Sequence, residues 1–342
     1  MTNKFLMYGV GVDISKDDFH ACVGGITIDA CFKVKAQRKF KNSAKGYEEL
    51  ASWLVKHLKE KITIKILMEV TGVYHEGLLY YLYNNGYEVY LEPGHRVKKY
   101  MSVLGYKSKT DKLDGKGMCQ MVLERTLIKW KPVSPSILKI RSLLRHRKAL
   151  QKTKVQFENQ LHAITHSQIK DAYVVKSLNK LIKTIEKQIA ELESKAMDLS
   201  NKDEAFYKKL STIVKSTKGL GFISVLTVLS ETNGFKTFRN RKQLESYAGY
   251  DVIENSSGKF VGRTRISKKG NANIRSVLYM AALSAVRTKS APFYDLYTRL
   301  IARNGGISKK ANVAVQRKLL LIIYTLWTKN EAFDLKYYNK AA

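Results

Sequence analysis

The sequence predicts an α/β sheet domain at the N-terminus, long helices in the middle and a mainly α domain at the C-terminus. Strand and helix patterns alternate over about the first 130 residues. Apolar residues then recur with a period of 3.5 between residues 178 and 199, and helical patterns dominate from about residue 206. We therefore divide the chain into residues 1–130, 137–205 and 206–342.

The first domain contains apolar stretches typical of strands, with amphipathic stretches between them that are typical of helices. The helices are expected at about residues 43–60 and 73–85. We expect a hairpin within FHACVGGITIDACF to turn at Gly24 and Gly25, because paired glycines favour tight turns. The expected strand segments are MYGVGVDIS, FHACVGG, TIDACFKVKA, ITIKILMEV and YEVYLEP.

The middle part contains a repeating apolar seam, typical of a coiled coil. In the preceding helix the seam is weaker, because Arg147 and Lys154 occupy alternate positions of its seven-residue repeat. Two antiparallel helices that pack on each other and coiling between two chains explain the pattern equally well. The seam residues are Leu178, Ile182, Ile185, Ile189, Leu192, Ala196 and Leu199.

The C-terminal domain alternates helical stretches with a polar loop. The loop ENSSGKFVGRTRISKKGN is rich in glycine, serine and basic residues, which is typical of a hairpin or loop. The helical stretches are SVLTVLSET, RKQLESYAG, IRSVLYMAALSAVRT and VAVQRKLLLIIYTLW.

The chain is strongly basic, with 61 Lys and Arg against 29 Asp and Glu and a net charge of +32. Such a charge favours a nucleic-acid partner through attraction to phosphate and counterion release. A basic protein that is merely soluble or ribosome-associated is the alternative. The apolar run at 319–327 is too short to span a membrane, and three widely spaced cysteines without a CxxC motif indicate a reducing cytoplasm.

Four acidic residues of the first domain stand where side chains converge on a site. Asp13 and Glu69 end two apolar strands, and Asp111 and Asp114 stand three apart at a helix start. Carboxylates so placed repel one another unless a hard divalent cation such as Mg²⁺ is bound between them. Helix capping explains Asp111 taken alone. The lysines around the aspartates suit an approaching phosphate: Lys107, Lys109 and Lys112.

The C-terminal loop concentrates basic residues around a glycine-flanked serine, Ser257. A serine that attacks a phosphodiester needs activation, and the developing negative charge needs neutralising. Ser256, Ser257 and Gly258 also suit a simple hairpin turn. The basic residues that suit neutralisation are Arg263, Arg265, Lys268, Lys269 and Arg275.

The segment KGLG precedes a helix and suits a phosphate-binding turn, because glycine allows close backbone approach. A simple helix start is the alternative explanation. The residues of this turn that we expect to contact nucleic acid are Lys218, Gly219 and Gly221.

The order of Asp13 in GVDISK, Glu69 in MEVTGVY, and Asp111 and Asp114 in KTDKLD resembles the DEDD transposases of the insertion-sequence 110 family. That family includes Piv-like DNA invertases and bridge-RNA-guided recombinases. The segments from KGLGFISVL to ISKKGNANIR are similar to the family's C-terminal transposase domain. The resemblance therefore covers nearly the whole chain.

The resemblance implies a RuvC-like, RNase H-type first domain whose four acidic residues are catalytic and bind Mg²⁺. It implies that Ser257 attacks DNA to give a phosphoserine intermediate. It further implies double-stranded donor and target DNA, a noncoding bridge RNA, and homodimers that assemble into tetramers. Two alternatives stay open: a RuvC-like nuclease or junction resolvase that uses metal-activated water, and a non-catalytic nucleic-acid-binding protein.

Overall fold

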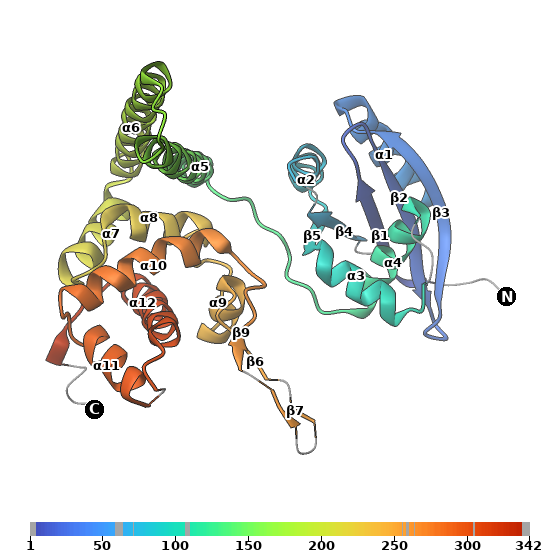
Figure 1. Cartoon of the computed structure of the whole chain (residues 1–342). Coiled ribbons are helices and arrows are strands. Elements are labelled where there is room, and N and C mark those ends of the chain that lie inside the picture. The colour runs from blue at the N-terminus through green and yellow to red at the C-terminus, as the bar shows by residue number, and fades with distance from the viewer. Residues whose placement is uncertain are drawn as a thin grey trace. The chain divides into compact units, whose positions relative to one another are not determined.

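The protein divides into two compact units, Met1–Pro132 and Val133–Ala342, which are drawn in Figure 1. The helices of residues 137–205 belong to the second unit. Their separation as a middle part of the chain stays a prediction. The computed structural model describes residues 5–58, 64–70, 72–106, 110–254, 256–257, 260–262, 264–303 and 305–336.

The first unit is built on one five-stranded sheet with the strand order β3-β2-β1-β4-β5. Strands β1 to β3 are antiparallel neighbours, while β4 runs parallel to both β1 and β5. An α/β domain is therefore confirmed at the N-terminus. The strands are β1 (Phe5–Ile14), β2 (Asp18–Thr27), β3 (Phe32–Lys41), β4 (Ile64–Val70) and β5 (Glu88–Pro93).

The sheet has an apolar core on each face. Val10 and Val12 of β1 pack with α1 and α2, whereas Leu67 of β4 and Tyr90 of β5 pack with α3 and α4. Because side chains alternate along a strand, even-numbered residues of β1 face α1 and α2, and odd-numbered residues face α4. The four helices are α1 (Ala44–His57), α2 (Glu76–Asn84), α3 (Gly94–Val103) and α4 (Asp111–Glu124).

The expected turn at Gly24 and Gly25 is wrong, because β2 continues through both residues and ends at Thr27. The two glycines admit close neighbours instead. A Cβ on Gly24 would lie 2.8 Å from the carbonyl oxygen of Lys33, and one on Gly25 would lie 2.6 Å from Cδ1 of Phe5. Close packing between strands, rather than a turn, explains the glycine pair.

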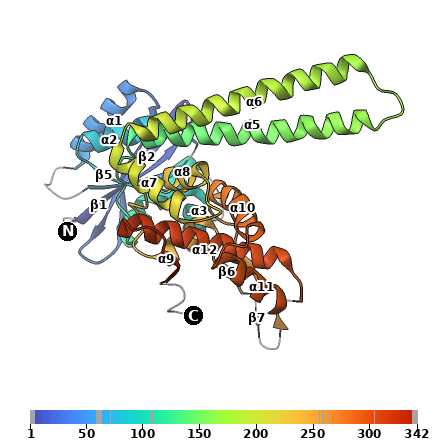
Figure 2. The ribbon, with the colours of Figure 1, turned by 90° about the vertical axis from the view of Figure 1, so that its left-hand side faces the viewer.

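The second unit begins with an antiparallel helical hairpin, α5 (Pro135–Thr165) and α6 (Ala172–Asn201), which Figure 2 shows as a long pair. The buried residues Leu178 and Ile185 belong to the predicted seam of α6. Lys154 of α5 pairs with Glu186 of α6 at 2.7 Å, and Arg147 pairs with Glu193. The two basic residues that interrupt the seam are thus paired across the hairpin. Coiling between two chains stays a prediction.

The rest of the second unit is mainly α, as the sequence predicts. One core joins these helices to the base of the hairpin through Ile140, Leu144 and Ala196. No helix in the described ranges is long and apolar enough to cross a membrane. The helices are α7 (Glu204–Ser216), α8 (Phe222–Glu231), α9 (Arg241–Ala248), α10 (Ala272–Arg287), α11 (Phe293–Arg303) and α12 (Ser308–Lys329). The short strands are β6 (Val252–Ile253), β7 (Ser256–Ser257), β8 (Phe260–Val261) and β9 (Arg265–Ile266).

Candidate active site

Asp13 and Glu69 lie on neighbouring parallel strands, at the carboxyl end of each. The register pairs Val12 of β1 with Met68 of β4, so Asp13 and Glu69 are the next residues along the two strands. Gly11 of β1 and Leu67 of β4 lie on the face of the sheet that α3 and α4 cover. Asp13 and Glu69 stand two residues further along the same strands, so their side chains lie on that face too. The backbone therefore places these two acidic residues side by side.

Asp111 and Asp114 both stand in the first turn of α4. Thr110 is the N-cap, and its Oγ1 accepts a hydrogen bond of 3.3 Å from the N–H of Leu113. The helix then meets β1 closely: a Cβ on Gly11 would overlap the backbone of Gly115. The first turn of α4 is thereby held beside the strand end that carries Asp13.

The four carboxylates are not gathered around one point. Among the described residues, no group of three or more His, Cys, Asp or Glu side chains is arranged to hold a metal ion. Glu69 points toward the N-terminus of α3, where a Cβ on Gly94 would overlap its Oε1. The donor set itself suits a hard divalent cation, because carboxylate oxygens are the ligands such ions prefer. Without that charge the carboxylates repel one another.

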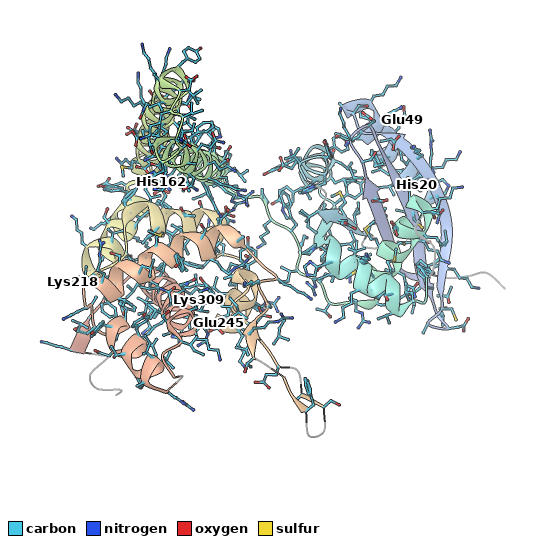
Figure 3. All side chains as sticks on the ribbon, in the orientation of Figure 1. His20, Glu49, His162, Lys218, Glu245 and Lys309 are labelled. Carbon is cyan, nitrogen blue, oxygen red and sulfur yellow. The ribbon has the colours of Figure 1, made fainter. Side chains whose placement is uncertain are left out.

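Two further titratable residues, which the sequence analysis missed, share this face of the sheet. His20 of β2 is opposite Asp13, and Glu92 of β5 is in register with Glu69. His20 is only 9% exposed, and among the described residues its Nδ1 has no hydrogen-bond partner. Burial lowers the pKa of His20, while Asp111 opposes that shift. Figure 3 labels His20 beside α4. Only the strand register reveals these neighbours.

The lysines predicted to contact nucleic acid near α4 are partly described. Lys112 is exposed in the first turn of α4. Lys107 and Lys109 lie outside the described residues.

The predicted phosphate-binding turn lies at the start of α8. Lys218 is exposed, as Figure 3 shows, and Gly221 is the helix N-cap. Gly219 has a φ of +95°, and a Cβ there would lie 2.6 Å from Cβ of Ala285. Both the left-handed backbone and the contact with α10 explain this glycine without a ligand.

Ser257 lies on β7, in an exposed two-stranded hairpin. It pairs with Phe260 of β8, and its side chain is exposed, as is that of Ser256. Gly258 lies outside the described residues, as does Arg263.

The other basic residues of this loop differ in their surroundings. Arg265 on β9, Lys268 and Lys269 are exposed. Arg275, by contrast, is used within the fold, because its Nη1 donates a 2.8 Å hydrogen bond to the carbonyl of Ala248 at the end of α9. The exposed three are accessible to a polyanion, while Arg275 holds the loop's flanking helices together.

A buried carboxylate, Glu231 at the end of α8, joins the hairpin base to the start of α10. Nε and Nη2 of Arg145 donate to it at 2.8 and 2.7 Å. The side chains of Asn271 and Asn273 donate at 2.8 and 2.9 Å. Burial opposes ionisation of Glu231, but hydrogen bonds from Arg145 and the two asparagines outweigh it and lower its pKa. The asparagines of the KKGNAN segment are thus explained by this network.

Replacing Glu231 with Gln is expected to destabilise the second unit by about 3 kcal/mol. The change leaves the Arg145 guanidinium without its counter-charge and puts an amide donor against asparagine donors. Thermal unfolding followed by circular dichroism measures the effect, with the exposed Glu191→Gln of α6 as the matched control. Equal midpoints for the two variants would contradict the network's structural role.

Two family profiles match the chain: one described as "Transposase", of the DEDD type of the IS110 family, over residues 10–170, and "Transposase IS116/IS110/IS902 family" over residues 211–298. The pilin gene-inverting protein of Moraxella bovis is 25% identical over 327 residues, which cover 95% of this chain and 97% of that protein. The transposase for insertion sequence element IS1111A of Coxiella burnetii is 25% identical over 150 residues, or 40% of this chain and 41% of that protein.

A solved structure, RuvC of Thermus thermophilus, aligns with 36% of this chain and all of its own, at 12% identity and a TM-score of 0.28. The two profile matches together cover most of the chain, and they include Asp13, Glu69, Asp111 and Asp114 in the first and Ser257 in the second. The chain belongs to the IS110 family of transposases.

Proposed function

We propose that the protein is a recombinase of an insertion sequence, which cleaves and exchanges DNA strands through a covalent serine intermediate. The observation that carries this proposal is the placement of Asp13 and Glu69 on adjacent strand ends, with the first turn of α4 beside them. The family to which the chain belongs cleaves and rejoins DNA, and a net charge of +32 suits that substrate.

In this proposal Asp13, Glu69, Asp111 and Asp114 hold Mg²⁺. The ion supplies charge stabilisation at the scissile phosphate when it is bound. The chain's own contribution is to place Asp13 and Glu69 on adjacent strands, with the capped helix turn that carries Asp111 and Asp114 beside β1. The exposed Lys112 in that turn attracts the neighbouring phosphates.

Ser257 is the proposed nucleophile. Its oxygen forms a bond to phosphorus, the bond from phosphorus to one ester oxygen of the DNA breaks, and the proton of the serine passes to that oxygen, which leaves as a DNA hydroxyl. A DNA hydroxyl then attacks the phosphorus, the bond from phosphorus to the serine oxygen breaks, and the proton of the attacking hydroxyl passes to Ser257. Arg265, Lys268 and Lys269 are exposed close by in the sequence and suit the developing charge.

The proposed partners follow the family resemblance. A noncoding bridge RNA pairs with double-stranded donor and target DNA, and dimers assemble into tetramers inside the cytoplasm. The acidic residues and Ser257 belong to different compact units. The family resemblance implies that one protomer supplies the acidic residues of a site and another supplies its serine. Sequencing the RNA that co-purifies with the protein tests the guide: we expect one structured species with two loops complementary to two DNAs, and heterogeneous RNA would contradict it.

The test of the serine is a covalent protein–DNA adduct that survives denaturant. We expect labelled DNA from the element's ends to become attached to the wild-type protein in Mg²⁺. Ser257→Ala should abolish the adduct, whereas Ser256→Ala, its exposed neighbour, should retain it. Cleavage without any adduct in the wild type would instead favour a RuvC-like nuclease that uses metal-activated water.

A further inference from the structure

A fifth acidic residue, Glu92, is buried at the same sheet edge. It lies near the end of β5, in register with Glu69, and is only 4% exposed. Burial raises its pKa, while Arg96 opposes that shift. A buried carboxylate is costly, and an apolar residue of similar size is often more favourable at such a place. Its presence therefore calls for an explanation beyond folding.

Glu92 of β5 forms an ion pair with Arg96, which lies four residues later in the first turn of α3. Nη1 of Arg96 donates a 3.1 Å hydrogen bond to Oε1 and lies 2.8 Å from Oε2. The Arg96 side chain is nevertheless 58% exposed. Within the described part of the chain, no hydrogen bond occupies its Nε or Nη2. One end of the guanidinium is thus fixed, and the other is presented to solvent.

The position of Arg96 sets it beside the candidate active site. Gly94, two residues earlier, is the residue whose Cβ would overlap Oε1 of Glu69. The same helix exposes Lys98 and Lys99 and contains no acidic residue. The first residue of a basic helix therefore lies next to Glu69, one of the proposed metal-binding residues.

We propose that Arg96, oriented by Glu92, binds a backbone phosphate of the DNA strand that enters the acidic site. The inference rests on the proposed function for the identity of the nucleic acid. An acidic cluster repels a polyanion, so a fixed cation at its rim lowers the cost of approach. The planar fork of a guanidinium suits two phosphate oxygens, and a pre-oriented side chain loses less entropy on binding than a free lysine.

The alternative is that Arg96 merely neutralises Glu92, and a double substitution separates the two roles. We would measure binding of a fluorescein-labelled duplex to the full chain in EDTA, over a series of salt concentrations. The variants are Arg96→Met and Glu92→Gln/Arg96→Met. The matched control is Lys56→Met, which removes an exposed charge from α1 on the opposite face of the sheet.

Both Arg96 variants should lower the salt slope of binding by about one, which weakens binding about tenfold at 0.1 M salt, while Lys56→Met should change little. If Arg96→Met fails to fold because Glu92 is left unpaired, the double variant decides. Wild-type binding and slope in the double variant would overturn the inference, as would a wild-type chain that does not bind the duplex in EDTA. Loss of slope without any serine adduct would overturn the proposed function and leave this inference standing.

Discussion

Replacing Asp13 with Asn is expected to reduce DNA cleavage below detection while leaving DNA binding nearly unchanged. The substitution keeps the size of the side chain and removes one negative charge at the end of β1, beside Glu69. A divalent cation is held chiefly by such charges, so its affinity for the site falls with each carboxylate lost. Because the surface stays strongly basic, attraction to the DNA backbone persists.

The cleavage of labelled DNA in Mg²⁺ measures this effect, with binding followed separately in EDTA. Asp17→Asn is the matched control, because Asp17 is exposed in the turn between β1 and β2. We expect it to cleave like the wild type. Cleavage at the wild-type rate by Asp13→Asn would contradict the proposed role of Asp13 in binding the metal ion.

Replacing Gly11 with Ala is expected to destabilise the first unit by about 3 kcal/mol. A Cβ there would lie 2.9 Å from the carbonyl carbon of Met118 and would overlap the backbone at Gly115 and Cys119. Because these are backbone atoms, α4 itself would have to shift away from β1. The shift would also move the helix turn that carries Asp111 and Asp114.

The matched control for this variant is a substitution of Gly115, which lies on the α4 side of the same contact with β1. A Cβ on Gly115 would meet its nearest neighbours, Cβ of Cys22 and the carbonyl of Gly11, at 3.5 and 3.6 Å. Gly115→Ala is therefore expected to be neutral or to stabilise α4 by up to about 1 kcal/mol. Thermal unfolding distinguishes the two glycines, and equal stability of both variants would contradict the close contact between β1 and α4.

The strand ends of the candidate site could be predicted from the sequence, because Asp13 and Glu69 interrupt strongly apolar runs. Their neighbours could not. The positions of His20 and Glu92 depend on strand register, which a single strand does not reveal. Helix α3 could not be predicted from the sequence either, because GHRVKKY has few apolar residues and directly follows a strand.

The misplaced turn at Gly24 and Gly25 has a related cause. A glycine pair favours a tight turn locally, but here β2 continues through both glycines. The rings of Phe32 and Phe5 occupy the space that side chains at Gly24 and Gly25 would fill. Long-range contacts likewise give Arg275 a structural partner that the loop sequence does not reveal, the carbonyl of Ala248 at the end of α9. Its predicted contact with nucleic acid stays a prediction. Local patterns identify the residue types, and the tertiary contacts decide which of them remain available to a ligand.

The measurement that tests the central claim most directly is adduct formation by three proteins side by side: the wild type, Asp13→Asn and Ser257→Ala. The claim is that acidic residues of the first unit and a serine of the second act in one reaction. It predicts a denaturant-resistant DNA adduct for the wild type in Mg²⁺, none in EDTA, and none for either variant. A full yield of adduct from either Asp13→Asn or Ser257→Ala would contradict it.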